Sequence, residues 1–290
     1  MGKTVDDGFR EFHGTLTPTR EQSQSAKRHR VSIEICLKNS FEMTRFVHTG
    51  SFGNGTSIRG YSDVDYFACI PTKNLYEDSL TTLQEVREVL LGRFQDADIT
   101  IKQPAVRVSF GADAFDSIEI VPADFLQGDH GGNFIYEIAD GAGGWLRSSP
   151  DAHHTYVDEV NRKLGGKVKP LVSVLKAWKY FHGVPIRSFY LEMYVAQYAS
   201  KIKSILFSKD VSNILTLLWE NQLAALPDPK GIIGNISPCA TKEQKSHALD
   251  KLDFSSTRAE EARAAETAGK ISDAFYWWNV VFARKFPSYD

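Results

Sequence analysis

The sequence predicts an α+β fold in two parts, a mixed sheet flanked by helices over residues 1–150 and a helical part over residues 151–290. Before Pro150, apolar and polar residues alternate in short runs, as in half-buried strands. After Pro150, apolar residues recur every three or four positions, as on one face of a helix. The length of 290 residues allows one large domain or two modest ones. A crevice between two such parts is a common place for a small-molecule site.

The first part opens with a long helix, which we expect from about Pro18 to Met43. Threonines near its start can cap it, proline is tolerated in a first turn, and the apolar residues that follow keep helical spacing. We then expect a strand, an amphipathic helix and two further strands, at residues 64–70, 75–94, 105–110 and 117–121. Residues 111–116 suit a hairpin loop, and Pro122 is expected to end the last strand.

The second part follows a glycine-rich segment, residues 127–150, which we expect to be irregular with short strands. Helices are expected at residues 153–164, 169–182, 189–199 and 211–226. The clearest helix lies near the end of the sequence, where apolar residues from Ala264 to Phe282 recur mostly three or four positions apart. We expect one continuous helix there, with its aromatic stripe packed against the first long helix.

Composition and charge argue against several classes of protein. The chain has 34 basic and 36 acidic residues and a net charge of −2, which argues against a protein that wraps long nucleic acid. Its three cysteines are far apart and lack zinc-site spacing. No apolar stretch reaches the ~18 residues of a membrane span, and the N-terminus lacks the apolar region of a secretory signal. We expect a monomeric cytoplasmic protein with no membrane partner.

The most informative feature is Gly50-Ser51, followed after eleven residues by Asp63-Val64-Asp65. Two aspartates at positions i and i+2 of a strand point to one face, where their charges repel each other unless a cation compensates. A hard divalent cation such as Mg²⁺ suits carboxylates together with phosphate oxygens. The Gly-Ser pair at a turn offers backbone N–H groups and a hydroxyl to the same phosphates, and a helix that began there would add a favourable dipole.

A third carboxylate on a neighbouring strand would complete a two-metal site for in-line attack on phosphorus. Glu119 is the candidate, because it alternates with Ile118 and Ile120 and so points to the opposite face of its strand. The alternative is that Glu119 simply faces solvent, and that the two aspartates form a solvated pair or a helix cap.

The Gly-Ser and Asp-x-Asp motifs together resemble the DNA-polymerase-β-like nucleotidyltransferase superfamily. The longer string GSFGNGTSIRGYSDVDYF is similar to one branch, the CD-NTases, which are cyclic-oligonucleotide synthases related to cyclic GMP–AMP synthase. Further landmarks follow in the order of that family: EIVPA at 119–123, SSP before a histidine at 148–153, LKAW at 175–178 and SFYLE at 188–192. The resemblance covers about residues 15–200 and implies a polymerase-β-like core, with the active site in the crevice beside the helical part.

The resemblance implies roles for the matched residues of the first part. Asp63, Asp65 and Glu119 would bind two Mg²⁺ ions, which Mn²⁺ could replace. Glu119 would also orient or deprotonate the acceptor hydroxyl, and Gly50 and Ser51 would hold the donor triphosphate. The third acid of this family is more often aspartate, so the longer glutamate could shift the metal position slightly.

Four residues of the helical part also match family positions. Lys176 and Ser188 match positions that contact triphosphate oxygens, and Phe189 matches an aromatic position that stacks on a base. Asn161 lies on the helix that supplies the floor of the base pocket, where it could favour uracil. The structural alternatives are a snorkelling surface lysine, a helix cap, a core aromatic residue and a surface asparagine.

The implied activity is the Mg²⁺-dependent joining of ribonucleoside triphosphates into a cyclic di- or oligonucleotide, with release of pyrophosphate. The product would be a second messenger in bacterial anti-phage signalling of the CBASS type. No nucleic-acid ligand would be required, because the sequence has neither a zinc insertion nor a basic stripe. The alternatives are an enzyme that moves a single nucleotide to RNA, protein or a small molecule, and a catalytically silent nucleotide-binding module.

Overall fold

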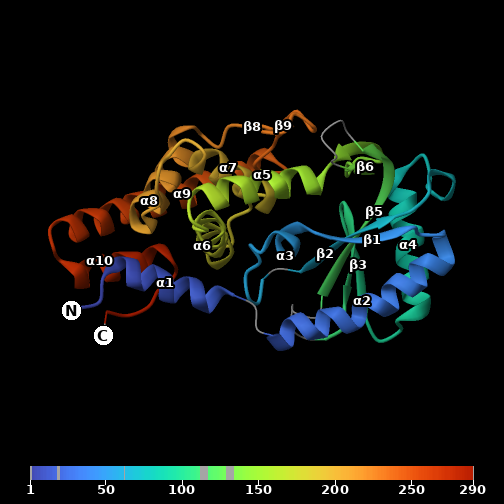
Figure 1. Ribbon diagram of the computed structural model, residues 1–290, viewed down its shortest axis with the longest axis horizontal. Helices are drawn as coiled ribbons and strands as arrows, with labels where there is room; N and C mark the ends of the chain where they lie inside the picture. The colour runs from blue at the N-terminus through green and yellow to red at the C-terminus, as the bar shows by residue number, and fades with distance from the viewer. Residues whose placement is uncertain (1, 18–19, 62, 112–116, 129–133, 290) are drawn as a thin grey trace. The chain divides into compact units, whose positions relative to one another are not determined.

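In the computed structural model, the chain has the expected α+β fold and forms two compact units (Figure 1). The model describes residues 2–17, 20–61, 63–111, 117–128 and 134–289. We call Pro18–His154 the sheet unit, and Met1–Thr17 together with Thr155–Asp290 the helical unit. The first 17 residues, which the sequence analysis placed with the sheet, therefore belong with the helices.

The sheet unit is built on one mixed sheet, in which β1-β2-β5-β4-β3 lie in that order and β6 and β7 extend it from β5. Strands β2 and β5 are parallel, and the other pairs are antiparallel. The strands are β1 (Arg45–Thr49), β2 (Val64–Cys69), β3 (Asp98–Lys102), β4 (Ala105–Ser109), β5 (Ser117–Gly128), β6 (Phe134–Ala139) and β7 (Trp145–Ser148).

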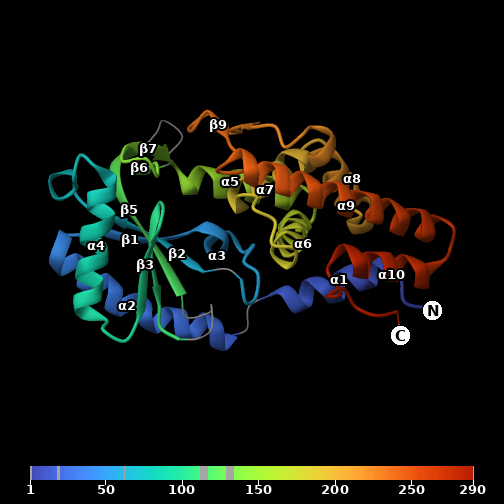
Figure 2. The ribbon, with the colours of Figure 1, turned by 180° about the vertical axis from the view of Figure 1, so that it is seen from behind.

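Helices α2 (Arg20–Phe41) and α4 (Ser79–Arg93) cover one face of this sheet (Figure 2). Their apolar side chains pack in one core with the even-numbered residues of β2 and β5, among them Val64, Tyr66, Ile118 and Ile120. Since side chains alternate along a strand, the odd-numbered residues point to the opposite face. The alternation predicted for Glu119 is therefore confirmed.

Strand β5 is longer than predicted, because Pro122 does not end it. The last residue of β5 paired with β4 is Ile120, and the first paired with β6 is Ala123. Pro122 lies between these two partners, where no strand on that side requires the N–H that proline lacks. The strand can therefore continue alongside β2, whose Ala68 pairs with Pro122.

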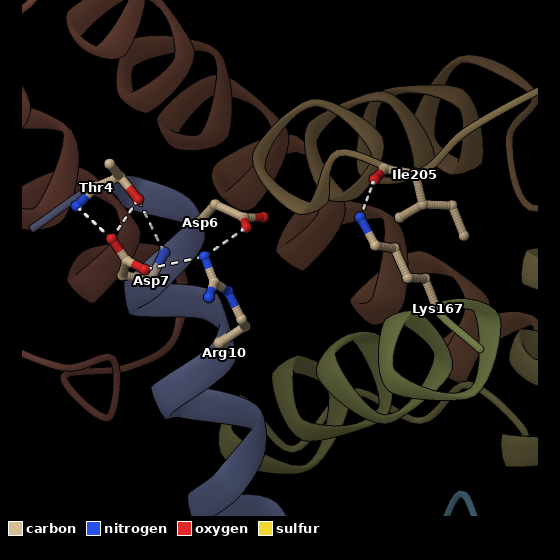
Figure 3. Close-up of polar contacts among 6 residues, drawn as sticks. All are labelled: Thr4, Asp6, Asp7, Arg10, Lys167 and Ile205. Carbon is tan, nitrogen blue, oxygen red and sulfur yellow. Dashed lines mark hydrogen bonds and ion pairs between the residues drawn. The ribbon is translucent and has the colours of Figure 1, made fainter. Parts of the chain in front are cut away.

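The helical unit begins with α1 (Val5–Leu16), which the sequence analysis missed. Thr4 and Asp7 form a capping box at its start, and Arg10 reaches back to Asp6 and Asp7 (Figure 3). Phe9 and Phe12 are fully buried. They lie in an aromatic cluster with four residues from later in the chain, Phe207, Trp278, Phe282 and Phe286.

The other helices of this unit are α5 (Pro150–Lys163), α6 (Val168–Phe181), α7 (Ser188–Ala199), α8 (Phe207–Glu220), α9 (Lys242–Thr267) and α10 (Ile271–Val281), with a short hairpin of β8 (Leu226–Pro227) and β9 (Asn235–Ile236). Lys167, just before α6, donates a hydrogen bond to the carbonyl of Ile205 (Figure 3). None of the helices described is long and apolar enough to cross a membrane.

The single terminal helix predicted from Ala264 to Phe282 is wrong, since the chain breaks there into α9 and α10. Gly269 lies between them with φ +74°, a left-handed conformation that ends a helix. The aromatic stripe of α10 packs against α1, not against the first long helix that was predicted (Figure 2). Helix α1, which the sequence analysis missed, therefore covers the aromatic residues of α10.

Candidate active site

Two of the predicted acids are direct neighbours on parallel strands. Asp65 on β2 pairs in register with Glu119 on β5, and both lie on the sheet face opposite α2 and α4. On the other side of Glu119 the register partner is Arg107 of β4. A row of charged residues, Asp65, Glu119 and Arg107, therefore crosses three adjacent strands on one face.

The third acid, Asp63, lies just before β2 and contacts this row from the strand end. The Nε and Nη2 groups of Arg107 each donate a hydrogen bond to Asp63 Oδ1, at 3.2 Å. Arg107 Nη2 also donates to the Ser117 hydroxyl at 3.0 Å. The sequence analysis did not single out Arg107; its place in the alternating strand AVRVSF, on the same face as the acids, was the available signal.

Glu119 has a carboxyl group whose pKa is far from its ordinary value. Its burial, together with the charges of Asp65 and Asp63 and a hydrogen bond to Asp63, raises the pKa of Glu119 to about 8, against a smaller opposing effect of Lys102. Lys102 Nζ is 3.9 Å from Glu119 Oε1, and the lysine side chain is half exposed. At neutral pH the Glu119 carboxyl therefore holds a proton in the metal-free protein.

The Gly-Ser motif lies beside the acids because β1 and β2 are antiparallel neighbours. Thr49 pairs with Asp65, and Gly50 follows as the first residue of α3 (Gly50–Asn54). Gly50 has φ +62°, and a Cβ on it would lie 1.9 Å from Asp65 Oδ2. Only glycine allows the backbone to approach the carboxylate so closely. Ser51 is half-buried in the same helix, and its carbonyl accepts a hydrogen bond from Thr56.

The donor set fits Mg²⁺ in its chemistry, because it consists of three carboxyl groups, one of which burial and the charges of the other two keep protonated. The carboxylates are not yet arranged as ligands. Among the residues that the model describes, no three His, Cys, Asp or Glu side chains are placed to hold a metal ion together. Asp63 instead pairs with Arg107, and both side chains are mostly buried, with 15% and 22% of their area exposed.

In the helical unit, Lys176 has surroundings that the sequence analysis did not foresee. The Lys176 side chain is fully buried, and its Nζ lies 3.5 Å from Oε2 of Glu192, which is also buried. The alternative of a snorkelling surface lysine is therefore wrong, and the contact of Lys176 with a triphosphate stays a prediction. A second lysine, Lys179, lies three residues later on α6.

Lys179 is the functional candidate that the sequence analysis missed. Its Nζ donates a hydrogen bond to the Ser188 hydroxyl at 2.7 Å, and the Tyr180 hydroxyl lies 3.2 Å from the same oxygen. Burial and the nearby Lys176 lower the pKa of Lys179 to about 8. The signal was present in the string LKAWK, whose two lysines are three residues apart and are therefore neighbours on the surface of α6.

Asn161 and Phe189, the two residues expected at the base, have different surroundings. The Asn161 side-chain oxygen accepts hydrogen bonds from the backbone N–H groups of Val168 and Lys169, at 3.0 and 3.1 Å. Asn161 on α5 thus caps the start of α6, a role that the sequence analysis did not consider. Phe189, at the start of α7, is 37% exposed, so its stacking on a base stays a prediction.

The predicted site residues are divided between the two units. Gly50, Ser51 and the three acids lie together in the sheet unit, whereas Lys176, Ser188, Phe189 and Asn161 lie in the helical unit. The expected crevice between the two parts stays a prediction.

Comparisons with known proteins agree with the fold. The structure of Vibrio cholerae DncV cyclic AMP-GMP synthase with the linear intermediate 5′ pppA(3′,5′)pG superposes with a TM-score of 0.77, at 14% identity, covering 100% of this chain and 98% of that one. Escherichia coli MS115-1 CdnC with ATP superposes with a TM-score of 0.75, at 17% identity, covering 97% and 98%.

Two curated proteins are similar over nearly the whole chain. A protein named probable cyclic nucleotide synthase from Bacillus cereus is 24% identical and aligns over 100% of both chains. Cyclic AMP-AMP-AMP synthase from an Acinetobacter species is 25% identical, over 98% of this chain and 86% of that protein. Residues 3–161, more than half of the chain, match the family model of the Second Messenger Oligonucleotide or Dinucleotide Synthetase (SMODS) domain. The chain therefore belongs to the SMODS family and is a nucleotidyltransferase of the CD-NTase type.

Proposed function

We propose that this enzyme joins ribonucleoside triphosphates into a cyclic di- or oligonucleotide in a Mg²⁺-dependent reaction that releases pyrophosphate. The observation that carries the proposal is the row of acids beside Gly50, in which Asp65 and Glu119 are direct neighbours and Asp63 contacts Glu119. The names of the relatives support a cyclic product.

The reaction is an in-line attack of a ribose hydroxyl on the α-phosphorus of a second nucleotide. A new P–O bond forms, the bond to the pyrophosphate leaving group breaks, and the hydroxyl proton is lost. Glu119 would orient that hydroxyl or accept its proton in the ionised form, which bound cations favour over the proton that Glu119 holds in their absence. Two Mg²⁺ ions held by Asp63, Asp65 and Glu119 would lower the pKa of the hydroxyl and neutralise the leaving group.

Each unit carries residues that are suited to bind triphosphate oxygens. Ser51 offers its hydroxyl, and Gly50 offers its backbone close to Asp65. Lys179 and Ser188 of the helical unit, already hydrogen-bonded to each other, bind triphosphate oxygens as a cation and a hydroxyl. Catalysis then consists mainly of positioning and charge stabilisation.

The biological part of the proposal is a cytoplasmic second-messenger role in bacterial anti-phage signalling. Relatives from Bacillus, Acinetobacter, Escherichia and Vibrio support the bacterial setting. Two relatives are named for products that contain AMP, so ATP is the first substrate to test.

The test is incubation of the purified protein with Mg²⁺ and the four ribonucleoside triphosphates, each labelled at the α-phosphate in turn. After phosphatase treatment, products are separated and weighed by mass spectrometry. A labelled species without a terminal phosphate supports the proposal, and its label names the bases. The double variant Asp63→Ala/Asp65→Ala should make none while keeping the circular dichroism spectrum of the wild type. Pyrophosphate release with only linear or transferred nucleotides would contradict a cyclic product.

A further inference from the structure

The feature that the proposed mechanism does not use is Arg107, a cation placed among acids that are expected to bind metal. Its guanidinium is mostly buried, with 22% of the side chain exposed, and it donates two hydrogen bonds to one oxygen of Asp63. An arginine so paired supplies the counter-charge that the acids need when no metal is bound. It also occupies an oxygen that a metal ion would use.

Arg107 has a second partner that holds it beside the row. Its Nη2 donates to the Ser117 hydroxyl, and Ser117 is in turn 2.8 Å from the hydroxyl of Ser109. Because these serines lie on β4 and β5 themselves, the guanidinium keeps one anchor in the sheet when it gives up Asp63. The pair with Asp63 can therefore break without releasing Arg107 into solvent.

We propose that Arg107 competes with divalent cations for Asp63 and thereby sets the cation concentration at which this enzyme becomes active. The inference rests on the proposed function, because it assumes that Asp63 is a metal ligand. It explains why three acids in one row are not arranged as a ligand set among the described residues. Arg107 is a positioning residue in this account, since it acts through Asp63 and touches no substrate.

The experiment measures Mn²⁺ binding directly, by the loss of the electron paramagnetic resonance signal of free Mn²⁺ as protein is added. In Arg107→Gln, removal of the competing cation should tighten Mn²⁺ binding about fivefold, the factor that corresponds to the upper range of a partly exposed ion pair. Arg107→Lys, which keeps the charge but loses the two-pronged geometry, should lie between Arg107→Gln and the wild type.

Arg45→Gln is the matched control, because it removes the same charge from the same sheet at the far end of β1. Arg45 pairs with Cys69 and lies over the Phe134 ring, away from the acids. Its Mn²⁺ affinity should equal that of the wild type. The Mg²⁺ concentration for half-maximal turnover should fall in Arg107→Gln and stay unchanged in Arg45→Gln.

Unchanged or weaker Mn²⁺ binding in a folded Arg107→Gln protein would overturn the inference. Arg107 would then have only the structural role of holding Asp63 in place. If Arg107→Gln does not fold, Arg107→Lys decides in the same way. Failure of the proposed function looks different: the wild type and Asp63→Ala/Asp65→Ala would then bind Mn²⁺ equally weakly. Tighter Mn²⁺ binding in Arg107→Gln and Arg107→Lys, with no change in Arg45→Gln, supports the competition.

Discussion

At the residue scale, Gly50 combines two constraints that no other residue type satisfies. Its φ of +62° is left-handed, and a Cβ would lie 1.9 Å from a carboxylate oxygen of Asp65. Gly50→Ala should therefore displace Asp65 and lower turnover at least about 100-fold, because misplacement of a reacting group by about 1 Å has that effect. Steady-state kinetics of pyrophosphate release measures it.

Gly55 provides the control for Gly50, since it is equally left-handed, with φ +69°, but has open space around its Cα. Gly55→Ala carries the same backbone strain, about 1–2 kcal/mol, without the contact. Its melting temperature should fall about as much as that of Gly50→Ala, while its turnover stays within a few-fold of the wild type. Equal loss of turnover in both variants would show that strain, and not the contact with Asp65, is responsible.

Glu119 makes the stability of the metal-free protein depend on pH. Its pKa rises from 4.5 to about 8 on folding, so the folded state binds the proton more tightly than the unfolded state. The free energy of unfolding must then fall as pH rises between these values. Glu119→Gln, which mimics the protonated acid, should melt a few °C above the wild type at pH 8.5 in chelator, with the difference closing at pH 5.

Glu137→Gln on β6 is the comparison for this melting series, since it changes the same group elsewhere in the sheet. Its melting curve should follow that of the wild type at every pH. A pH-independent difference between Glu119→Gln and the wild type would mean that burial alone, without titration, accounts for the effect.

At the element scale, α6 separates two lysines by function. Lys176→Ala leaves Glu192 buried without its cation, which should cost about 3–5 kcal/mol of stability. Lys179→Ala removes a hydrogen bond to Ser188 and a phosphate contact, and should raise the KM for nucleotide about tenfold. Thermal melts and initial-rate kinetics on both variants distinguish them. A Lys176→Ala protein with wild-type stability and a raised KM would return the phosphate role to Lys176.

These lysines also show where sequence reasoning reaches its limit. The strands that carry the acids, the alternation that places Asp65 and Glu119 on one face, and the glycine beside them follow from local sequence patterns, whereas the order of the strands in the sheet does not. Which of two lysines in LKAWK faces the core depends on α7, which supplies Glu192 to one and Ser188 to the other. The orientation of the two lysines is determined by packing between helices, and a sequence motif does not specify it.

The same holds for Asn161 and for α1. Asn161 on α5 accepts hydrogen bonds from residues at the start of α6, so its role depends on where that next helix begins. Gly8 and Gly14 make α1 hard to recognise as a helix in the sequence. In the structure, a Cβ at Gly8 would lie 2.8 Å from the Phe275 ring. Gly8 is therefore required by packing against α10. That helix is far from Gly8 in the sequence, so no local sequence pattern contains this contact.

At the scale of the whole molecule, the division into two units predicts separate responses to core damage. Phe9→Ala removes a fully buried ring from the aromatic cluster and should cost about 3–5 kcal/mol. Hydrogen exchange should then increase in α1, α6, α8 and α10 and stay unchanged in the strands. Phe46→Ala, in the core of the sheet unit, should give the converse pattern. Faster exchange throughout both units in either variant would show that they unfold together.

The aromatic cluster around α1 has a consequence for the order in which this chain can acquire its structure. The residues of the sheet unit are continuous, so every contact within it is available once His154 has been synthesised. Helix α1 is synthesised before the sheet unit, but its partners on α6, α8 and α10 are synthesised after it, so its phenylalanines wait for those partners while the sheet unit is completed. A chain stopped just after α5 would therefore display three acids on a completed sheet and an amphipathic helix whose partners have not yet been made.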